Sequence, residues 1–334
     1  MKTWTYHVYG LVIRSAMALP GMPEAAGAGE PDLFLEIAGE HRAPEGRGPS
    51  AAHAEAGRRL PDGERLSIEP AQNGAHLFRY GNQASFELCS DGRLIVAPSE
   101  ASGSAYARHT ALLRVLMDFV LPVVSLQRGF AVMRAGAVEQ DGGVIAFVSK
   151  KHDTSALAAE FTRRGHPLVC GAVLALHRSH DVVWAHPGPP HYHVALRPGR
   201  DTASTTLGVT IATLRDGAWV VAPRSAARRG PLTGVYVLED GAGPHIKVVR
   251  APATPAAVLP YALALDRRLT PQRECPDVYG ALAARVPMYR LSAPPGTGAS
   301  ALADAVLSAP WRASVRRPVD PFPHPPSNVH EVVP

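Results

Sequence analysis

The chain has 334 residues, of which 46% are hydrophobic and 19% charged. This length and apolar content suffice for one large domain or two modest ones, and they exclude wholesale disorder. The formal net charge of +5 suits an ordinary Arg-rich surface, and it is also compatible with an acidic partner. No basic helix interleaved with aromatic residues and no nucleic-acid motif is present, so we expect no nucleic-acid partner.

Three cysteines, Cys89, Cys170 and Cys275, have no metal-ligand spacing, and their odd, sparse number favours a reducing compartment. The first residues lack a charged-then-apolar leader. We expect no apolar run long enough to cross a bilayer, and hence no membrane partner. These features predict a cytoplasmic protein, and the abundance of Ala and Arg favours a bacterial source.

The first part of the chain alternates short β-type runs with Asn-Gly, Gly-Asn and Asp-Gly turns. This pattern predicts a small antiparallel, β-rich domain over residues 1–104, with an exposed loop at residues 42–59. The expected strands are Trp4–Ile13, Asp32–Ile37, Leu66–Glu69, His76–Tyr80, Ala84–Cys89 and Leu94–Ala97.

A long helical pattern follows at Ala105–Leu126, with an apolar stripe that includes Leu112, Leu116 and Phe119. Pro122 is expected to bend or end this helix, because proline removes a backbone donor. The pattern predicts a packing helix.

The central stretch runs from Phe130 to Leu176 and is expected to form strand, turn, strand, loop, helix, turn and strand. A buried strand, a polar loop and a helix whose N-terminus faces that loop form the geometry of a phosphate-binding unit. The expected pieces are Ala131–Val138, a turn at Asp141-Gly142-Gly143, Val144–Val148, the loop Ser149–Asp153, Thr154–Arg164, a stop at Gly165-His166-Pro167, and Leu168–Leu176.

The loop itself departs from a working phosphate loop, which reads G-x-x-x-x-G-K-[ST]. Residues 149–155 read SKKHDTS and contain no glycine. Lys150 and Lys151 precede the place where a lysine is needed, and Asp153 puts a negative charge where a phosphate would approach. The sequence therefore indicates that the strand, loop and helix scaffold is retained while the residues that would bind phosphate are lost.

This stretch resembles the HPr kinase/phosphorylase-like P-loop proteins, in particular the small kinases found with lasso-peptide and other ribosomal-peptide biosynthesis genes. The resemblance is carried in order by MRAGAV (133–138), DGGVIAFV (141–148), SALAAEF (155–161), GHPLVCGAVLAL (165–176), AHPGPP (185–190), PLTGVYVL (231–238) and ARVPMYRL (284–291). It implies an α/β P-loop core with a mixed sheet flanked by helices over residues 105–310, after the β-rich N-terminal domain.

The departures from the family fall on its functional positions. Thr154 or Ser155 occupies the place of the phosphate-loop lysine, Gly171 and Ala172 replace an acidic pair, and Arg134 replaces a histidine. The resemblance, read with these losses, implies a pseudokinase that holds a precursor peptide or a partner enzyme in ribosomal-peptide biosynthesis. Self-association is left open.

Two enzymatic alternatives stay open. An active kinase would use ATP and Mg²⁺, with Lys150 or Lys151 on the phosphates and His152 or Asp153 as base for a peptide hydroxyl. A new activity would use Ser149, His152 and Asp153, which lie close in sequence but need not meet in space. In either case the candidate anion- or nucleotide-binding residues are Ser149, Lys150, Lys151, Thr154 and Ser155, placed at a helix N-terminus that attracts anions.

The rest of the chain is expected to continue the sheet and to end in a tail. The turn His186–His193 carries three histidines. It is expected to line the cleft, where His191 or His193 could touch a ligand, and a metal site there is the less favoured interpretation. Residues 311–334 are Pro-rich and are expected to be disordered. The other expected elements are strands at Val182–Ala185, Thr205–Leu214, Trp219–Ala222, Val235–Glu239, His245–Arg250 and Val286–Ser292, and helices at Pro255–Leu265, Pro276–Ala284 and Ala299–Leu307.

Overall fold

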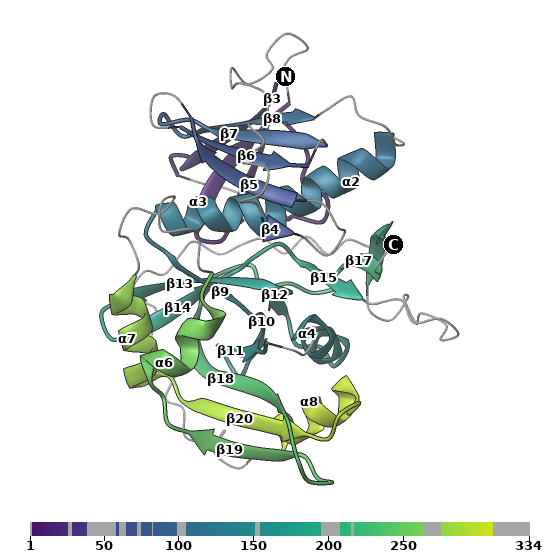
Figure 1. The fold of residues 1–334 in the computed structure, drawn as a ribbon, viewed down its shortest axis with the longest axis vertical. Helices are drawn as coiled ribbons and strands as arrows, with labels where there is room; N and C mark the ends of the chain where they lie inside the picture. Colours follow the sequence, from purple (N-terminus) through teal and green to yellow (C-terminus); the bar gives the residue numbers. More distant parts are fainter. Residues whose placement is uncertain are drawn as a thin grey trace.

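The computed structural model describes residues 2–25, 29–38, 58–59, 65–71, 75–81, 83–98, 105–150, 154–194, 208–214, 217–263 and 275–309. Within these ranges the protein is a mixed α/β structure with three β-sheets and few helices (Figure 1). The expected tail, residues 311–334, lies outside the described residues.

The N-terminal sheet has eight strands in the order β1-β2-β3-β8-β7-β6-β5-β4. The pairs β2–β3 and β3–β8 are parallel, so the sheet is mixed and the expectation of a purely antiparallel one was wrong. The predicted strand Trp4–Ile13 is a hairpin, because Tyr9 and Gly10 take left-handed φ angles of 54° and 80°. The strands are β1 (Trp4–Val8), β2 (Leu11–Ser15), β3 (Leu33–Ile37), β4 (Arg58–Arg59), β5 (Arg65–Pro70), β6 (His76–Tyr80), β7 (Ala84–Leu88) and β8 (Arg93–Pro98).

One long helix lies between the N-terminal sheet and the larger sheet (Figure 1). It consists of α2 (Ala105–Val115), a π-helical turn η2 (Leu116–Val120) and α3 (Leu121–Gln127). The helix continues past Pro122, because the wider turn of η2 accommodates the missing donor. By length and composition His109–Gln127 could cross a membrane, contrary to expectation, but 72% of this stretch is buried inside the protein. Its apolar character is therefore accounted for by packing.

The core sheet has nine strands, with the path β12-β10-β11-β18-β14-β13-β9 and with β20 and β19 joined beyond β18. Strands β11, β18 and β20 are parallel neighbours, and β19 closes that side antiparallel to β20. The strands are β9 (Ala131–Arg134), β10 (Gly136–Gln140), β11 (Gly143–Val148), β12 (Leu168–Cys170), β13 (Val173–Ser179), β14 (Val182–His186), β18 (Gly230–Asp240), β19 (Lys247–Ala251) and β20 (Met288–Ala293).

Three expected elements divide differently in the structure. The run Leu168–Leu176 breaks at Gly171 and Ala172 into β12 and β13, which pair with β10 and β9. The run Ala131–Val138 breaks at Ala135 into β9 and β10, which pair with different strands. The second half of the histidine-rich turn is a strand, β15 (His191–Val194), which forms a three-stranded sheet with β17 (Gly217–Val221) and β16 (Val209–Leu214).

The helices that flank the core sheet begin close to where they were expected. Helix α4 (Thr154–Arg163) follows β11, and α8 (Ala299–Leu307) follows β20. Gly165, with a φ of +94°, ends the turn after α4. On the other face lie α6 (Pro255–Val258), the short 3₁₀ turn η3 (Leu259–Tyr261) and α7 (Pro276–Arg285).

Candidate functional site

The predicted strand and helix form as expected, while most of the loop between them lies outside the described residues. Strand β11 is buried along its whole length and runs parallel to β18, so the carboxyl ends of both strands meet at one edge of the sheet. Ligands in open α/β sheets bind outside the carboxyl ends of such strands. The start of α4 and the ends of β11, β18 and β20 therefore define the candidate site.

The first residues after β11 point in different directions. The Ser149 hydroxyl donates to the Leu238 carbonyl at 3.2 Å, which ties the loop to β18. The Lys150 side chain is exposed at the edge of the sheet. Lys151, His152 and Asp153 lie outside the described residues. Of the predicted cationic pair, Lys150 is thus the member that the structure places beside the site.

The start of α4 packs tightly into the protein. A Cβ on Gly136 of β10 would lie 2.7 Å from the Thr154 carbonyl oxygen, so this glycine lets the helix approach the sheet closely. Ser155 is 7% exposed, and its hydroxyl donates to the Gly171 carbonyl oxygen at 2.8 Å. The Ser155 side chain is therefore directed into the protein, away from where the sequence placed it as a ligand.

Gly171 is closed in by backbone. A Cβ at this position would overlap the His191 carbonyl oxygen and lie 2.9 Å from the Tyr192 Cα. No side chain, and hence no carboxylate, fits where the family resemblance would place an acidic residue. Ala172 is exposed just before β13. Burial raises the pKa of the neighbouring Cys170 thiol, which agrees with its expected role as a small core residue.

Two carboxylates that the sequence analysis missed lie at this edge. Strand β18 continues three residues beyond Val237, the partner of the last β11 residue, and ends at Glu239 and Asp240. Glu239 forms an ion pair with Arg290 at 3.1 Å, and both side chains are largely exposed. The signal was present in the sequence, since VYVLED is an apolar strand that ends in two acids.

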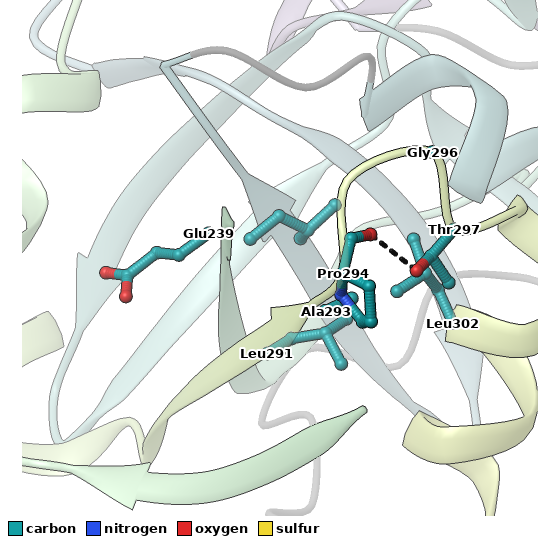
Figure 2. Close-up of a pocket in the computed structure, with 8 residues that line it drawn as sticks. Glu239, Leu291, Ala293, Pro294, Gly296, Thr297 and Leu302 are labelled. Carbon is teal, nitrogen blue, oxygen red and sulfur yellow. Dashed lines mark hydrogen bonds between the residues drawn. The ribbon is translucent and has the colours of Figure 1, made fainter. Parts of the chain in front are cut away.

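A small hollow lies beside Glu239, at the carboxyl ends of β18 and β20 (Figure 2). Its volume of about 40 Å³ suits a small group, because pockets for drug-sized ligands measure roughly 300–1,000 Å³. Figure 2 shows the Glu239 carboxylate on the side away from the loop, where the Thr297 hydroxyl donates to the Pro294 carbonyl at 2.6 Å. The hollow is lined by Leu238, Glu239, Leu291, Ala293, Pro294, Gly296, Thr297 and Leu302.

The turn between β20 and α8 is a second strand, loop and helix unit at the same edge. Residues 293–300 read APPGTGAS, which places Gly298 and Ser300 at the last glycine and the hydroxyl of a phosphate loop. Ala293 stands at the first glycine and Ala299 at the lysine, so this loop too lacks the cation. Without that glycine and lysine, the turn has no feature in the sequence that marks it as more than a connection.

Two of the three histidines of residues 186–193, His191 and His186, lie away from the candidate cleft, and His193 is half-buried on β15 opposite Trp219. The ring of His191 is 5% exposed, packs against Trp219 and bonds through Nε2 to the Pro20 carbonyl at 2.7 Å. Burial lowers the pKa of His191 to about 4, so the ring is neutral near pH 7. His191 thus joins β15 to the segment between β2 and β3, and its expected place at a ligand was wrong.

His186 belongs to a separate pair on the core sheet. Its Nε2 lies 2.6 Å from the Nδ1 of His177, and the Phe130 ring packs edge-on against both. Burial, with the nearby His177 and Arg229, lowers the pKa of His186 to about 3. Among the described residues, no three His, Cys, Asp or Glu side chains come together as a metal site would require.

Comparison with known proteins adds little to this geometry. No family model matches the chain, and no curated protein matches it. One solved structure that matches is the Hpr(Ser) kinase/phosphatase from Coxiella burnetii, at 10% sequence identity and a TM-score of 0.29. The match covers 53% of this chain and 93% of that one. Because the TM-score is low, this likeness does not bear on the role of any residue in the candidate site.

Proposed function

We propose that this protein is a non-catalytic binding protein built on a kinase-like α/β scaffold. Its role would be to hold a precursor peptide or a partner enzyme of ribosomal-peptide biosynthesis in the cytoplasm. The peptide class comes from the sequence resemblance described above. The loss of phosphoryl transfer is argued from the residues of the candidate site.

The observation that carries this proposal is the closure of the site at Gly171. Phosphoryl transfer requires metal-bound charge neutralisation at the phosphates. The Gly171 position admits no carboxylate, since its Cβ would overlap the His191 carbonyl. The Ser155 hydroxyl, which could otherwise reach a metal or phosphate, donates to the Gly171 carbonyl. Two of the groups that the chemistry needs are therefore replaced by internal packing.

Isothermal titration calorimetry with ATP and GTP, each with and without Mg²⁺, tests this proposal. We expect no binding heat at millimolar nucleotide, with wild-type protein and Lys150→Ala giving the same flat titration. Magnesium-dependent binding at micromolar concentration, about −8 kcal/mol, would overturn the proposal. Circular dichroism on the same samples establishes that a flat titration comes from folded protein.

A second candidate function, an active peptide kinase, is favoured by one observation. Glu239 and Asp240 end the strand next to β11, where P-loop enzymes place the acidic residue that holds Mg²⁺. Lys150 is exposed at the same edge and could reach a phosphate. On this hypothesis ATP and Mg²⁺ bind, and the carboxylates of β18 replace those missing at Gly171 and Ala172.

The kinase hypothesis predicts a specific pattern in the same calorimetry. Asp240→Asn should abolish the magnesium-dependent part of nucleotide binding, and Lys150→Ala should weaken binding with or without the metal. Asp277→Asn, which removes an exposed carboxylate on α7, is the matched control. Equal nucleotide binding by Asp240→Asn and wild type would exclude β18 as the magnesium strand.

A further inference from the structure

Among the described residues, strand β19 is a regular and exposed strand at the end of the core sheet. It pairs with β20 over five consecutive residues, from Lys247↔Ser292 to Ala251↔Met288, without a register shift. Its burial pattern is exposed or half-exposed throughout, and the Val249 side chain is 56% exposed. A strand of this kind presents unpaired backbone groups to the surroundings.

The other sheet ends in the described ranges are shortened, irregular or covered, and β15, one end of the three-stranded sheet, lies against Gly171 through its His191 carbonyl. Strand β4 has two residues, and β16 pairs with a register shift. The Ala25 amide bonds to the Thr5 carbonyl of β1, and the Leu263 amide bonds to the Val132 carbonyl of β9. On β12 the Leu168 amide and carbonyl bond to residues 224 and 226. Proteins protect sheet edges by such means, so the regular, open edge at β19 calls for a partner.

The charges on β19 disfavour a second copy as that partner. The exposed residues include Lys247 and Arg250, and His245 is exposed just before the strand. An antiparallel pairing of two β19 strands about Val249 puts Lys247 opposite Ala251 and Arg250 opposite Val248, which brings four cationic side chains and no carboxylate onto two five-residue strands. Shifting that pairing by one residue puts Lys247 directly opposite Arg250, and like charges directly opposite are destabilising. The same charges favour a strand that carries acidic side chains. Among the nearby acids, Glu239 is already paired with Arg290.

We propose that β19 binds an extended, acidic peptide segment, which adds to the core sheet as a further strand. This proposal rests on the proposed binding function and names the element that carries it. The added strand would gain backbone hydrogen bonds from β19, ion pairs with Lys247 and Arg250, and apolar contact with Val249. Since Lys247 lies opposite Ser292, one end of the bound peptide would lie near the turn at Ala293 and Pro294 that lines the hollow.

The test uses a fluorescein-labelled seven-residue peptide of Glu and Val and measures fluorescence anisotropy with the full chain. Two of its Glu residues stand three positions apart with Val between them, because Lys247 and Arg250 point to opposite faces of β19. Two control peptides are compared with it: the same sequence with Lys in place of Glu, and the Glu/Val peptide with its alternate backbone amides N-methylated along one edge. Of the three peptides, we expect only the unmodified acidic one to bind. Equal binding of the N-methylated peptide would overturn strand addition, and no binding of the acidic peptide would overturn the proposal entirely.

Charge reversal on the protein supplies the matched variants. The double variant Lys247→Glu/Arg250→Glu should weaken binding at least about tenfold, because two opposite-charge pairs become like-charge pairs. Arg178→Glu, an exposed reversal on β13, should leave the affinity unchanged. Amide hydrogen exchange on wild-type protein should slow at residues 247–251 when the acidic peptide is added. Unchanged exchange there would place the peptide elsewhere and contradict the proposal.

The peptide-binding test and the nucleotide calorimetry can fail independently of each other. If nucleotide binds in calorimetry but the Glu/Val peptide still adds to β19, the non-catalytic assignment fails and the docking strand stands. If neither nucleotide nor peptide binds, the non-catalytic assignment survives and the docking strand fails.

Discussion

The Ser155 hydroxyl donates to the Gly171 carbonyl oxygen across 2.8 Å. The sequence places Ser155 among the candidate anion-binding residues and Gly171 at the place of a missing acid, and here the two residues bond to each other in the interior. The contact joins the first turn of α4 to the start of β13. At this point the candidate site is therefore closed by internal packing.

Removing the Ser155 hydroxyl should lower the stability of the protein without affecting binding of the acidic peptide. Ser155→Ala removes the hydroxyl that donates to the buried Gly171 carbonyl. Because a buried acceptor that loses its donor is destabilising, we expect a loss of about 1–3 kcal/mol in the free energy of unfolding. Urea denaturation measures it. Ser179→Ala, near the exposed end of β13, should change stability by much less. A stability equal to wild type for Ser155→Ala would mean that the hydrogen bond contributes nothing in solution.

A methyl group at Gly171 should be costly. Gly171→Ala places a Cβ onto the His191 carbonyl and must displace β15, which we expect to cost at least about 1–3 kcal/mol. The control is the same substitution where space is open: Gly280→Ala in α7 should stabilise the protein by about 0.5–1 kcal/mol, because alanine favours helix. Thermal unfolding compares the two, and equal melting temperatures would contradict the close approach.

Sequence reasoning located the strand, loop and helix unit because its signals are local. The apolar run before Ser149 and the helical spacing from Thr154 to Gly165 depend on near neighbours, and α4 ends within one residue of its predicted end. Sequence reasoning could not show that the Ser155 side chain points inward. Its hydrogen-bond acceptor, the Gly171 carbonyl, is 16 residues away, and only the packing of the backbone brings the two groups together.

The same limit explains the missed or misplaced groups. Glu239 and Asp240 become candidates only when β18 is known to lie parallel beside β11, a pairing between strands about 90 residues apart in sequence. His191 resembles a ligand in the sequence, but in the fold its ring bonds to the carbonyl of Pro20, between β2 and β3. The break between β9 and β10 follows from their different partners, which no local pattern encodes.

Glu160 should make stability depend on acid pH. Hydrogen bonds from Arg163, and then from Arg164, lower the pKa of this carboxyl to about 2. The folded pKa lies below the ordinary value, so the stabilisation is present above about pH 4.5 and is lost as the pH falls toward 2. Glu160→Gln should be less stable than wild type at pH 6, and the difference should vanish near pH 2. Denaturant midpoints across this range measure it, and a constant difference would contradict the assignment.

Asp118 should have the opposite effect on the pH profile. It lies in the π-helical turn between the two sheets, where burial raises the pKa of its carboxyl to about 6 and Arg114 partly opposes the shift. The folded pKa lies above that of the unfolded chain, so this group favours the folded state below about pH 4 and loses that contribution as the pH rises through 6. Asp118→Asn stays neutral, and its stability should therefore exceed that of wild type by a margin that grows between pH 4 and 7, reaching about 1–3 kcal/mol. Urea unfolding at pH 4, 5, 6 and 7 measures the margin, with Asp277→Asn on the surface of α7 as the control. If the margin stays flat across this range, the Asp118 carboxyl is solvated in solution and the wider turn of η2 opens to water.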